Sequence, residues 1–266
     1  MEYRKEVAKV GRFKQIYLVV KPVFIVALPA LAIGLLFGVV AILVFEFHPL
    51  TAIIPTAVLT TYTCIWLWQK SPNIILDALN VQPVSSDPQE ISEKRLNSVV
   101  ASLCTIYGLP MPALYVVETE AVNIAALGKD HLKAHLVLTR GALDKLDRLE
   151  LEAIVSWQLL KLQSRLEIPT LLASVAKLLN SSRIFVENML LPIHNHEIIL
   201  GHDRLTVQTT RYPPALISAF KRIWEAPEVE SPSAFVHLWL VAPQNSLLTD
   251  KLQPHLHIRI NALQEL

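Results

Sequence analysis

The sequence predicts a mainly α-helical protein with a small antiparallel β-sheet, which stands behind an N-terminal hairpin of two transmembrane helices. Two uncharged apolar runs near the N-terminus predict the hairpin. Helical spacing of apolar residues over most of the remaining chain predicts helices, and β-rich runs are confined to residues 113–139. Apolar residues make up 52% of the 266 residues, enough for one sizeable core beside a membrane anchor.

The first apolar run, at residues 22–45, contains 24 residues without a charge. A helix needs about 20 such residues to cross a bilayer. The second run, at residues 50–68, follows a short turn and ends in Trp66 and Trp68, which suit the headgroup interface. A cleavable signal peptide has a shorter apolar part, and here a second apolar run follows directly. We therefore interpret the pair as a retained hairpin.

Basic residues predict the orientation of this hairpin. Six of them precede the first span, and none lies in the turn between the spans. The positive-inside rule then places both termini, and with them the main domain, in the cytoplasm. The basic segment at residues 1–21 either lies along the anionic leaflet or only sets the topology. The six residues are Arg4, Lys5, Lys9, Arg12, Lys14 and Lys21.

Composition divides the chain into three parts. Residues 1–70 form the basic segment and the membrane hairpin. Residues 71–90 are rich in Pro, Ser, Asp and Asn, which is the composition of a linker. Residues 91–266 then form a second, mostly helical domain.

The charge and the cysteines exclude some classes of function. The formal net charge is +1 and the C-terminal part has no basic run, so we expect no nucleic-acid partner. Cys64 falls in the second span and Cys104 in a predicted helix. They form neither a disulfide framework nor a pair of metal ligands.

The stretch after the linker predicts one helix and then a small sheet. Apolar residues recur at helical spacing over residues 91–107, and Gly108 ends this helix. Two β-rich runs, at residues 113–119 and 135–139, flank a third at residues 123–128. We expect these runs to form a small antiparallel sheet.

The remainder predicts helices. Residues 148–165 carry acidic residues early and basic residues late, as the helix dipole prefers. Residues 170–191 are apolar, but three charged residues interrupt them, which favours a soluble or interface-lying helix over a third span. Shorter helices are predicted at residues 213–224 and 257–266.

Four short motifs follow one another along the second domain. Gly108 and Pro112 form a Gly-x-x-x-Pro segment, and residues 123–126 read Asn-Ile-Ala-Ala. Thr139 opens a Thr-Arg-Gly-Ala-Leu run, and Glu150 opens a Glu-Leu-Glu-Ala run. In this order and behind a membrane hairpin, the motifs resemble those of the HtpX-like zinc metallopeptidases, relatives of the CAAX prenyl proteases.

The resemblance implies a zincin-like peptidase domain, in which a His-Glu-x-x-His helix binds zinc and supplies a general base. Aligned on Glu150, that motif falls on Trp157, Gln158 and Lys161. The indole nitrogen of Trp157 only donates, and Lys161 places a cation at a ligand position. The amide of Gln158 cannot accept a proton at neutral pH, so the general base is missing too.

The resemblance also implies a third zinc ligand and a late histidine, and both are replaced. The third ligand is a Glu four residues before an Asp that matches Asp203, which gives Ile199. Glu197 lies two residues away, about 200° round a helix, and points elsewhere. Gln253 stands in place of the His of a His-Pro-Pro element. We therefore predict no catalytic site, no zinc and no other cofactor.

Histidines elsewhere leave an alternative metal site open. His194, His196 and His202 lie close together in the sequence, near Glu197 and Asp203. These residue types can hold a relocated metal ion. The other interpretation is that the first two histidines are exposed polar residues, since no acid or base accompanies them at hydrolase spacing.

Two further candidates are weaker. His131 and His135 have the i, i+4 spacing of a helical ligand pair. The predicted β-hairpin, however, puts them on a turn and a strand and not on one face of a helix. We interpret them as polar residues of the surface. Ser156 lacks the surroundings of a nucleophile elbow and is not predicted to be a nucleophile.

The part of the resemblance that needs no metal concerns peptide binding. In the family an extended peptide adds as a strand beside the Asn-Ala-Phe-Ala edge, through backbone hydrogen bonds. The candidate positions here are Asn123, Ile124, Ala125 and Ala126. The alternative is an ordinary edge strand of a small sheet.

The sequence thus favours a membrane-anchored pseudopeptidase that acts by binding a protein partner, as a regulatory or scaffold subunit. One alternative is a structural or assembly subunit of a larger membrane protein complex. The other is a metallopeptidase with a relocated metal site.

Overall fold

The computed structural model describes residues 31–40, 42–43, 49–85, 89–128, 132–163, 167–178, 196–243 and 253–266. Residues 1–21, much of the first predicted span, His131 and His194 lie outside these ranges. The chain divides into two compact units, residues 1–71 and residues 72–266.

The first unit contains a helix over residues 31–40 and most of helix α3 (Pro49–Ala78). The two helices approach closely at Gly34, where an added Cβ atom would lie 2.5 Å from the Thr60 hydroxyl oxygen. Among the described residues, no helix combines the length and the apolar character that a membrane span requires. The transmembrane hairpin therefore stays a prediction.

Helix α3 continues beyond the second predicted span to Ala78, into the stretch where the composition predicts a linker. Its last turns carry the buried side chains of Ile75 and Leu76. Packing of an apolar face stabilises a helix more than the propensities of its residues do. This packing explains why a stretch with Pro and Asn is helical.

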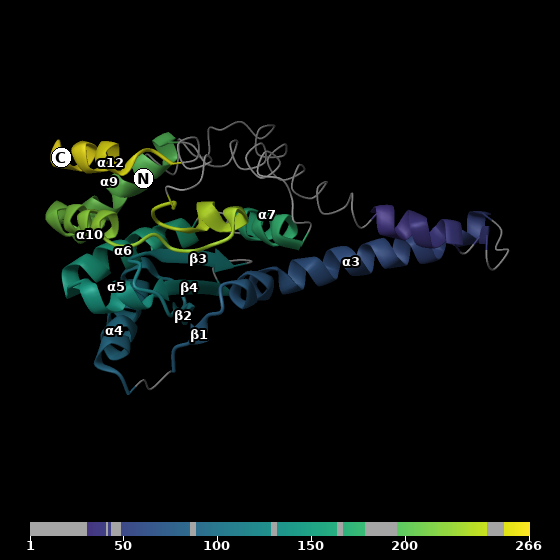
Figure 1. The fold of residues 1–266 in the computed structure, drawn as a ribbon, viewed down its shortest axis with the longest axis horizontal. Coiled ribbons are helices and arrows are strands. Elements are labelled where there is room, and N and C mark those ends of the chain that lie inside the picture. The colour runs from purple at the N-terminus through teal and green to yellow at the C-terminus, as the bar shows by residue number, and fades with distance from the viewer. Residues whose placement is uncertain are drawn as a thin grey trace. The chain divides into compact units, whose positions relative to one another are not determined.

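The second unit contains a four-stranded sheet in the order β1-β2-β4-β3 (Figure 1). The sheet is mixed, because β2 and β4 run parallel while the other two pairs are antiparallel. The purely antiparallel sheet that the sequence predicts is therefore wrong. Strand β3 runs back along the sheet, and β4 reverses again and inserts between β3 and β2. The strands are β1 (Gln82–Pro83), β2 (Ala113–Val117), β3 (Ile124–Gly128) and β4 (Ala134–Thr139).

Helix α4 (Ile91–Tyr107) has the bounds that its periodicity predicts. It buries Leu96, Val100 and Leu103 on one face. Gly108 ends the helix in the left-handed region, with a φ of 63°, which glycine adopts without strain. The predicted stop is confirmed.

Helix α5 (Arg140–Lys145) follows β4 directly and is capped by the side chain of Thr139. Gly141 lies in its first turn, against the backbone of the loop between β2 and β3. Its N–H donates to the carbonyl of Thr119 at 2.9 Å. An added Cβ atom would lie only 2.3 Å from the carbonyl oxygen of Glu120. The position therefore requires glycine because of space, not because of its φ angle.

We expect Gly141→Ala to lower the free energy of unfolding by about 3 kcal/mol, because the Cβ atom meets backbone that has to shift. Gly108→Ala is the matched control. Nothing lies within 4 Å of its added Cβ atom, so only the left-handed φ costs about 1 kcal/mol. Denaturant unfolding followed by circular dichroism measures both. Equal losses would contradict the close approach at Gly141.

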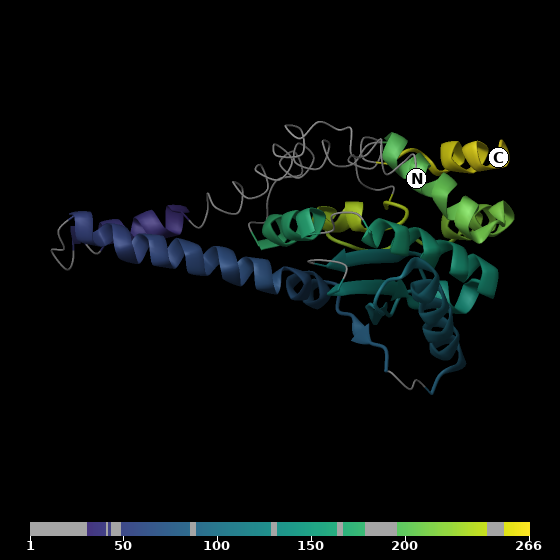
Figure 2. The same ribbon diagram turned by 180° about the vertical axis from the view of Figure 1, so that it is seen from behind.

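Helix α6 (Arg148–Leu162) is the central helix of the second unit. It packs against β3, α4, α9 (His196–Thr210) and α10 (Pro213–Glu225). Figures 1 and 2 place it between the sheet and the layer that contains α9, α10 and α12 (Leu256–Gln264). Most of its residues are buried, so its side chains meet neighbours on nearly all sides.

The start of α6 is fixed by the Glu-Leu-Glu-Ala run. Asp147 and Glu150 form a capping box, in which each side chain accepts from the other residue's N–H. The second oxygen of Glu150 accepts from Ser218 at 2.5 Å and from Arg222 at 2.7 Å, both on α10. This buried carboxylate therefore sets where α6 begins and joins it to α10.

Helix α7 (Glu167–Leu178) covers the first part of the apolar stretch at residues 170–191. The remainder of that stretch lies outside the described residues. Helix α7 packs against β3 and against the short 3-10 helix η1 (Ser233–Leu238). The chain that leaves η1 passes beside β3 and leads into the candidate site.

Candidate functional site

The positions that the resemblance assigns to the zinc ligands and the general base are all buried. Trp157, Gln158 and Lys161 on α6 are 3%, 0% and 6% exposed, and Ile199 on α9 is 4% exposed. Helix α6 brings the first three into the interior because it lies between the sheet and α9, and Ile199 lies on the buried face of α9. What these side chains bind there decides what chemistry the site supports.

Trp157 directs its indole toward α9. Its Nε1 donates to Oδ1 of Asp203 at 2.7 Å. The ring of His202 meets the indole edge-on, with 5.4 Å between the ring centroids. Burial lowers the pKa of His202 to about 4, so its ring is neutral at pH 7. The indole fills space and hydrogen-bonds a carboxylate, and it has no lone pair for a metal.

Asp203 also forms a buried ion pair with Arg259 of α12. The Nε and Nη2 atoms of Arg259 donate to the two carboxylate oxygens at 2.9 and 2.7 Å. Both side chains are 1% exposed, and the guanidinium lies 4.3 Å from the ring centroid of Phe220. The sequence reasoning identified Asp203 as a landmark and missed Arg259. The only sequence feature that could have indicated Arg259 is its position in a short predicted helix, which has to bury one of its faces.

Gln158 turns toward the sheet. Its Nε2 donates to the carbonyl of Ile124 on β3 at 2.9 Å. Its Oε1 is buried and has no hydrogen-bond partner in the part of the chain that the structure describes. The side chain therefore binds the edge strand and offers no carboxylate.

Lys161 reaches the last two residues of η1. Its Nζ donates to the carbonyls of His237 and Leu238 at 3.1 and 3.2 Å. Burial, reinforced by the positive charge of Arg259, lowers the pKa of Lys161 to about 7. The amine thus binds backbone carbonyls at the position where the family places a zinc ligand.

The carbonyls that Lys161 binds belong to residues 237–242, which we name the strap. The strap runs along the outer edge of β3. Ala125 pairs with Trp239 in an antiparallel bridge, and the N–H of Leu240 donates to the carbonyl of Ile124 at 2.8 Å. The strap therefore occupies the position that an added strand would take.

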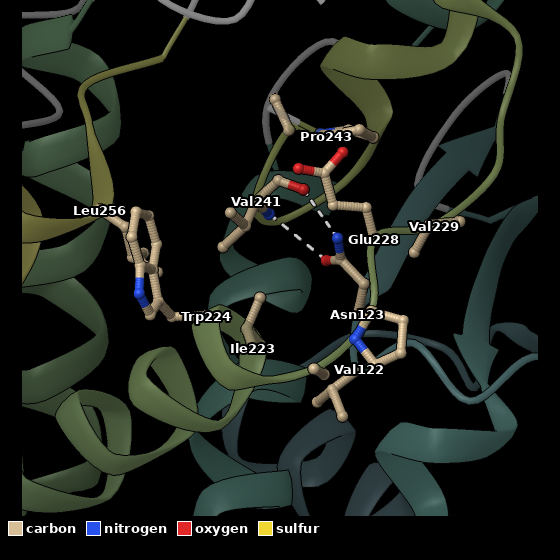
Figure 3. A pocket seen from close by; sticks show the side chains of 12 residues that line it. Val122, Asn123, Ile223, Trp224, Glu228, Val229, Val241, Pro243 and Leu256 are labelled. Carbon is tan, nitrogen blue, oxygen red and sulfur yellow. Dashed lines mark hydrogen bonds between the residues drawn. The ribbon is translucent and has the colours of Figure 1, made fainter. Parts of the chain in front are cut away.

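Asn123 and Arg259 hold the second half of the strap. The Nδ2 of Asn123 donates to the carbonyl of Val241 at 2.7 Å, and its Oδ1 accepts from the N–H of Val241 at 3.3 Å. The Nη1 of Arg259 donates to the carbonyl of Leu240 at 2.8 Å. The amide of Asn123 (Figure 3) and the guanidinium of Arg259 thus hydrogen-bond backbone groups of two consecutive residues of the strap, Val241 and Leu240.

Gln253, which stands in place of the family's late histidine, holds the strap from another side. Its Nε2 donates to the carbonyl of Trp239 at 3.1 Å. Its Oε1 accepts from the N–H of Ala242 at 3.0 Å. Two of the replaced positions, Lys161 and Gln253, therefore bind the backbone of the protein's own strap.

The candidate peptide-binding edge lies under this strap. Asn123 is 4% exposed, and Ile124, Ala125 and Ala126 are fully buried. The carbonyl of Ile124 already accepts from Leu240 and from Gln158. A peptide that adds to this edge has to displace the strap first.

The depressed pKa of Lys161 predicts how stability changes with pH. Unfolding returns the pKa from about 7 to about 10.4, so between these values the unfolded chain binds a proton that the folded chain lacks. Stability should therefore rise with pH across this window, by at most about 5 kcal/mol. In Lys161→Met this rise should be absent. Unfolding free energies of both proteins at about pH 7 and pH 9 measure the difference, and parallel pH profiles would contradict the buried amine.

The side chains at these positions do not fit a zinc ion. The indole of Trp157 has no lone pair for a metal, Lys161 directs its Nζ at two backbone carbonyls, Gln158 uses its amide nitrogen on β3, and Ile199 is apolar. Within the described ranges, no group of three or more His, Cys, Asp or Glu residues is placed to hold a metal ion.

The histidines of the alternative metal site do not converge within the described part of α9. His196 and His202 are six residues apart on this helix, about 240° round its axis. His202 is buried against Trp157, whereas His196 lies at the first residue of the helix. His194 lies outside the described residues.

The two weaker candidates have structural partners. His135 lies on β4 with its ring against Tyr115, at 5.7 Å between ring centroids. The hydroxyl of Ser156 hydrogen-bonds the hydroxyl of Tyr107 at 2.5 Å. His131 lies outside the described residues.

Comparison with known proteins gives the family resemblance a quantitative basis. The chain is 32% identical over 123 residues to "Protease HtpX homolog 2" of Methanosarcina mazei. The matched segment covers 45% of this chain and 40% of that protein. It is 32% identical over 107 residues to the HtpX homolog of Dictyoglomus turgidum, covering 40% and 34%. For the HtpX homolog of Acaryochloris marina the values are 32% over 131 residues, covering 49% and 42%.

These matches span less than half the length of each curated relative. The relatives are named as proteases. No protein-family model matches the chain, and no solved structure matches it. The protein is therefore HtpX-like over about half of its length.

Proposed function

We propose that this protein is a membrane-anchored pseudopeptidase, which binds no zinc, cleaves no peptide and acts by binding a protein partner as a regulatory or scaffold subunit. One observation carries the proposal. Trp157, Gln158 and Lys161, which the resemblance aligns with the His-Glu-x-x-His motif, are all buried and hydrogen-bonded to other parts of the same chain.

The proposed setting is the cytoplasmic face of a membrane. Two apolar runs, at residues 22–45 and 50–68, support a bilayer anchor, and the basic residues before the first run support cytoplasmic termini. Such an anchor holds the second domain near other membrane proteins. Restriction to one surface raises the effective concentration of a partner on that surface.

A second candidate is a structural or assembly subunit of a larger membrane protein complex. The strap favours it, because residues 237–242 already lie along the outer edge of β3. In the family this edge takes up peptides. In this case the fold supplies packing surface, and the former cleft takes no part in binding.

Purification of the tagged full chain from its own membranes in mild detergent tests the proposal. We expect a co-purifying protein at a fixed ratio to the chain, and no chelator-sensitive hydrolysis of casein or quenched peptides. A stable complex with a protease would favour the regulatory role, and a complex with an unrelated assembly would favour the structural role. Chelator-sensitive hydrolysis by the chain alone would overturn both.

A further inference from the structure

The two helices of the first unit contact each other through small residues. On the helix over residues 31–40, which Figures 1 and 2 show alongside α3, Gly34 and Gly38 are buried and every other residue is exposed. A Cβ atom added at Gly34 would lie 2.5 Å from Oγ1 of Thr60 and 3.1 Å from the carbonyl oxygen of Thr56. A Gly-x-x-x-Gly stripe of this kind lets two helix backbones approach closely. We name Gly34, Gly38, Thr56 and Thr60 the seam.

The large apolar side chains of this helix pair point outward. Leu36 is 69% exposed on the first helix, and Val58 is 63% exposed on α3. In water, a helix buries its apolar stripe and exposes its polar residues. This pair buries glycine and exposes leucine and valine, which suits surroundings as apolar as the side chains themselves. Further exposed members of the same surface are Ile33, Leu35, Phe37, Ile54 and Tyr62.

The threonines of α3 need no water for their hydroxyl groups. Oγ1 of Thr60 donates to the carbonyl of Thr56 at 2.9 Å, and Oγ1 of Thr63 donates to the carbonyl of Leu59 at 2.8 Å. Such bonds to the preceding turn satisfy a hydroxyl within its own helix. Thr56, Thr60 and Thr63 follow one another at i, i+4 and i+7 and are only partly exposed. The threonines that make α3 less apolar on average therefore share its inner face.

Length and charge indicate that a lipid bilayer covers the outer surface. From Pro49 to Trp68, α3 is about 30 Å long, which is the thickness of the hydrocarbon core. From the start of the first described helix to Lys70, Glu46 is the one charged side chain in the sequence. Trp66 and Trp68 are exposed just before Lys70, as residues at headgroup level are. A protein partner would cover one side, whereas the exposed residues of the first helix lie on every side except the seam.

We propose that the first unit is a lipid-facing helix pair. The seam holds the two helices together, and the acyl chains of a bilayer cover the large apolar side chains on the outer surface. Trp66 and Trp68 lie at the level of the headgroups. The inference rests on the membrane anchor of the proposed function, and it assigns which side chains meet lipid and which meet the other helix.

Spin labels test the lipid-facing surface in the full chain, reconstituted into vesicles of phosphatidylcholine and phosphatidylglycerol. In a background with Cys64→Ala and Cys104→Ala, a single label is attached at Phe37→Cys, Val58→Cys or Ser98→Cys. We expect the labels at the first two positions to collide more often with oxygen, which dissolves among acyl chains, than with a water-soluble nickel chelate. Ser98 is an exposed polar residue of α4 and the control, at which the order should be reversed.

A pair of labels tests the seam. Labels at Leu36→Cys and Tyr62→Cys, two exposed positions on the two helices, should give one narrow distance distribution in dipolar EPR spectroscopy. Gly34→Leu places a large side chain in the seam and should lengthen the mean distance by about 2 Å, because the side chains at the contact set the spacing of packed helices. Ala32→Leu adds the same side chain at an exposed position of the same helix and should leave the distance unchanged.

Nickel accessibility at Phe37→Cys or Val58→Cys equal to that at Ser98→Cys would overturn the lipid-facing surface. A distance that Gly34→Leu changes no more than Ala32→Leu does would overturn the seam. The proposed function has a separate readout. If the labels are accessible to water while the chain still recovers a partner and hydrolyses no peptide, the inference fails and the protein-binding role stands. Chelator-sensitive hydrolysis would remove the pseudopeptidase role and leave the helix pair in place.

Discussion

Replacement of Asp203 by asparagine is expected to lower the free energy of unfolding by about 3–5 kcal/mol. The carboxylate accepts hydrogen bonds from Trp157 and from two nitrogens of Arg259. Arg259 is 1% exposed, so the substitution leaves a buried cation without its counter-charge. That unpaired charge costs more than the altered hydrogen bonds. Denaturant unfolding of the full chain in detergent, followed by circular dichroism, measures the loss.

Two further variants separate the ion pair from general sensitivity to mutation. Asp144→Asn removes an exposed carboxylate and should change stability by less than about 0.5 kcal/mol. The double variant Asp203→Asn/Arg259→Met should be more stable than the sum of the single losses predicts, since it removes the unpaired charge. A loss for Asp203→Asn no larger than that for Asp144→Asn would contradict the buried pair.

Trp157→Ala is the second large effect, with an expected loss of about 3–5 kcal/mol. The indole is 3% exposed and packs between Asp203, His202 and Arg259. Its removal leaves a cavity beside polar groups that lose a donor. Thermal unfolding of the variant and the parent under the same conditions measures this loss.

Matched substitutions divide the contribution of Trp157 into its parts. Trp157→Phe keeps most of the packing and removes the donor to Asp203, so we expect about 1–3 kcal/mol. Trp224→Ala removes an indole that is 58% exposed and should cost much less than Trp157→Ala. If both Trp→Ala variants lost the same stability, the proposed role of Trp157 in the core would be wrong.

Local patterns predicted several elements well. The bounds of α4 follow from its apolar spacing and from Gly108, and the start of α6 follows from the acidic residues at its first turn. The order of the strands did not follow from any local pattern. Strand β4 pairs with both β2 and β3, and pairing between strands that are distant in sequence depends on how the chain crosses the sheet. The same limit applies to the end of α3, where Ile75 and Leu76 are buried in the folded chain.

In the candidate site, too, the sequence predicts the chemistry of the side chains but not the groups that they bind. The chemistry of Trp157, Gln158 and Lys161 follows from their residue types once they are aligned on Glu150. Their partners do not, because the acceptors of Lys161 are backbone carbonyls more than 70 residues along the chain. A carbonyl leaves no signal in the sequence, so the strap was not predictable from it. The strap also changes the expectation for Asn123–Ala126, whose outer edge is bonded within the protein.

The zinc content of the full chain, purified from cells grown with added zinc and measured by plasma mass spectrometry, tests the central claim most directly. That claim is that Trp157, Gln158 and Lys161, which align with the family's metal site, bind other parts of the same chain, and that the protein holds no zinc. We predict zinc far below one ion per chain, and an unfolding temperature that a chelator does not change. One zinc ion per chain, lost in His196→Ala and His202→Ala variants, would contradict the claim and favour a relocated metal site.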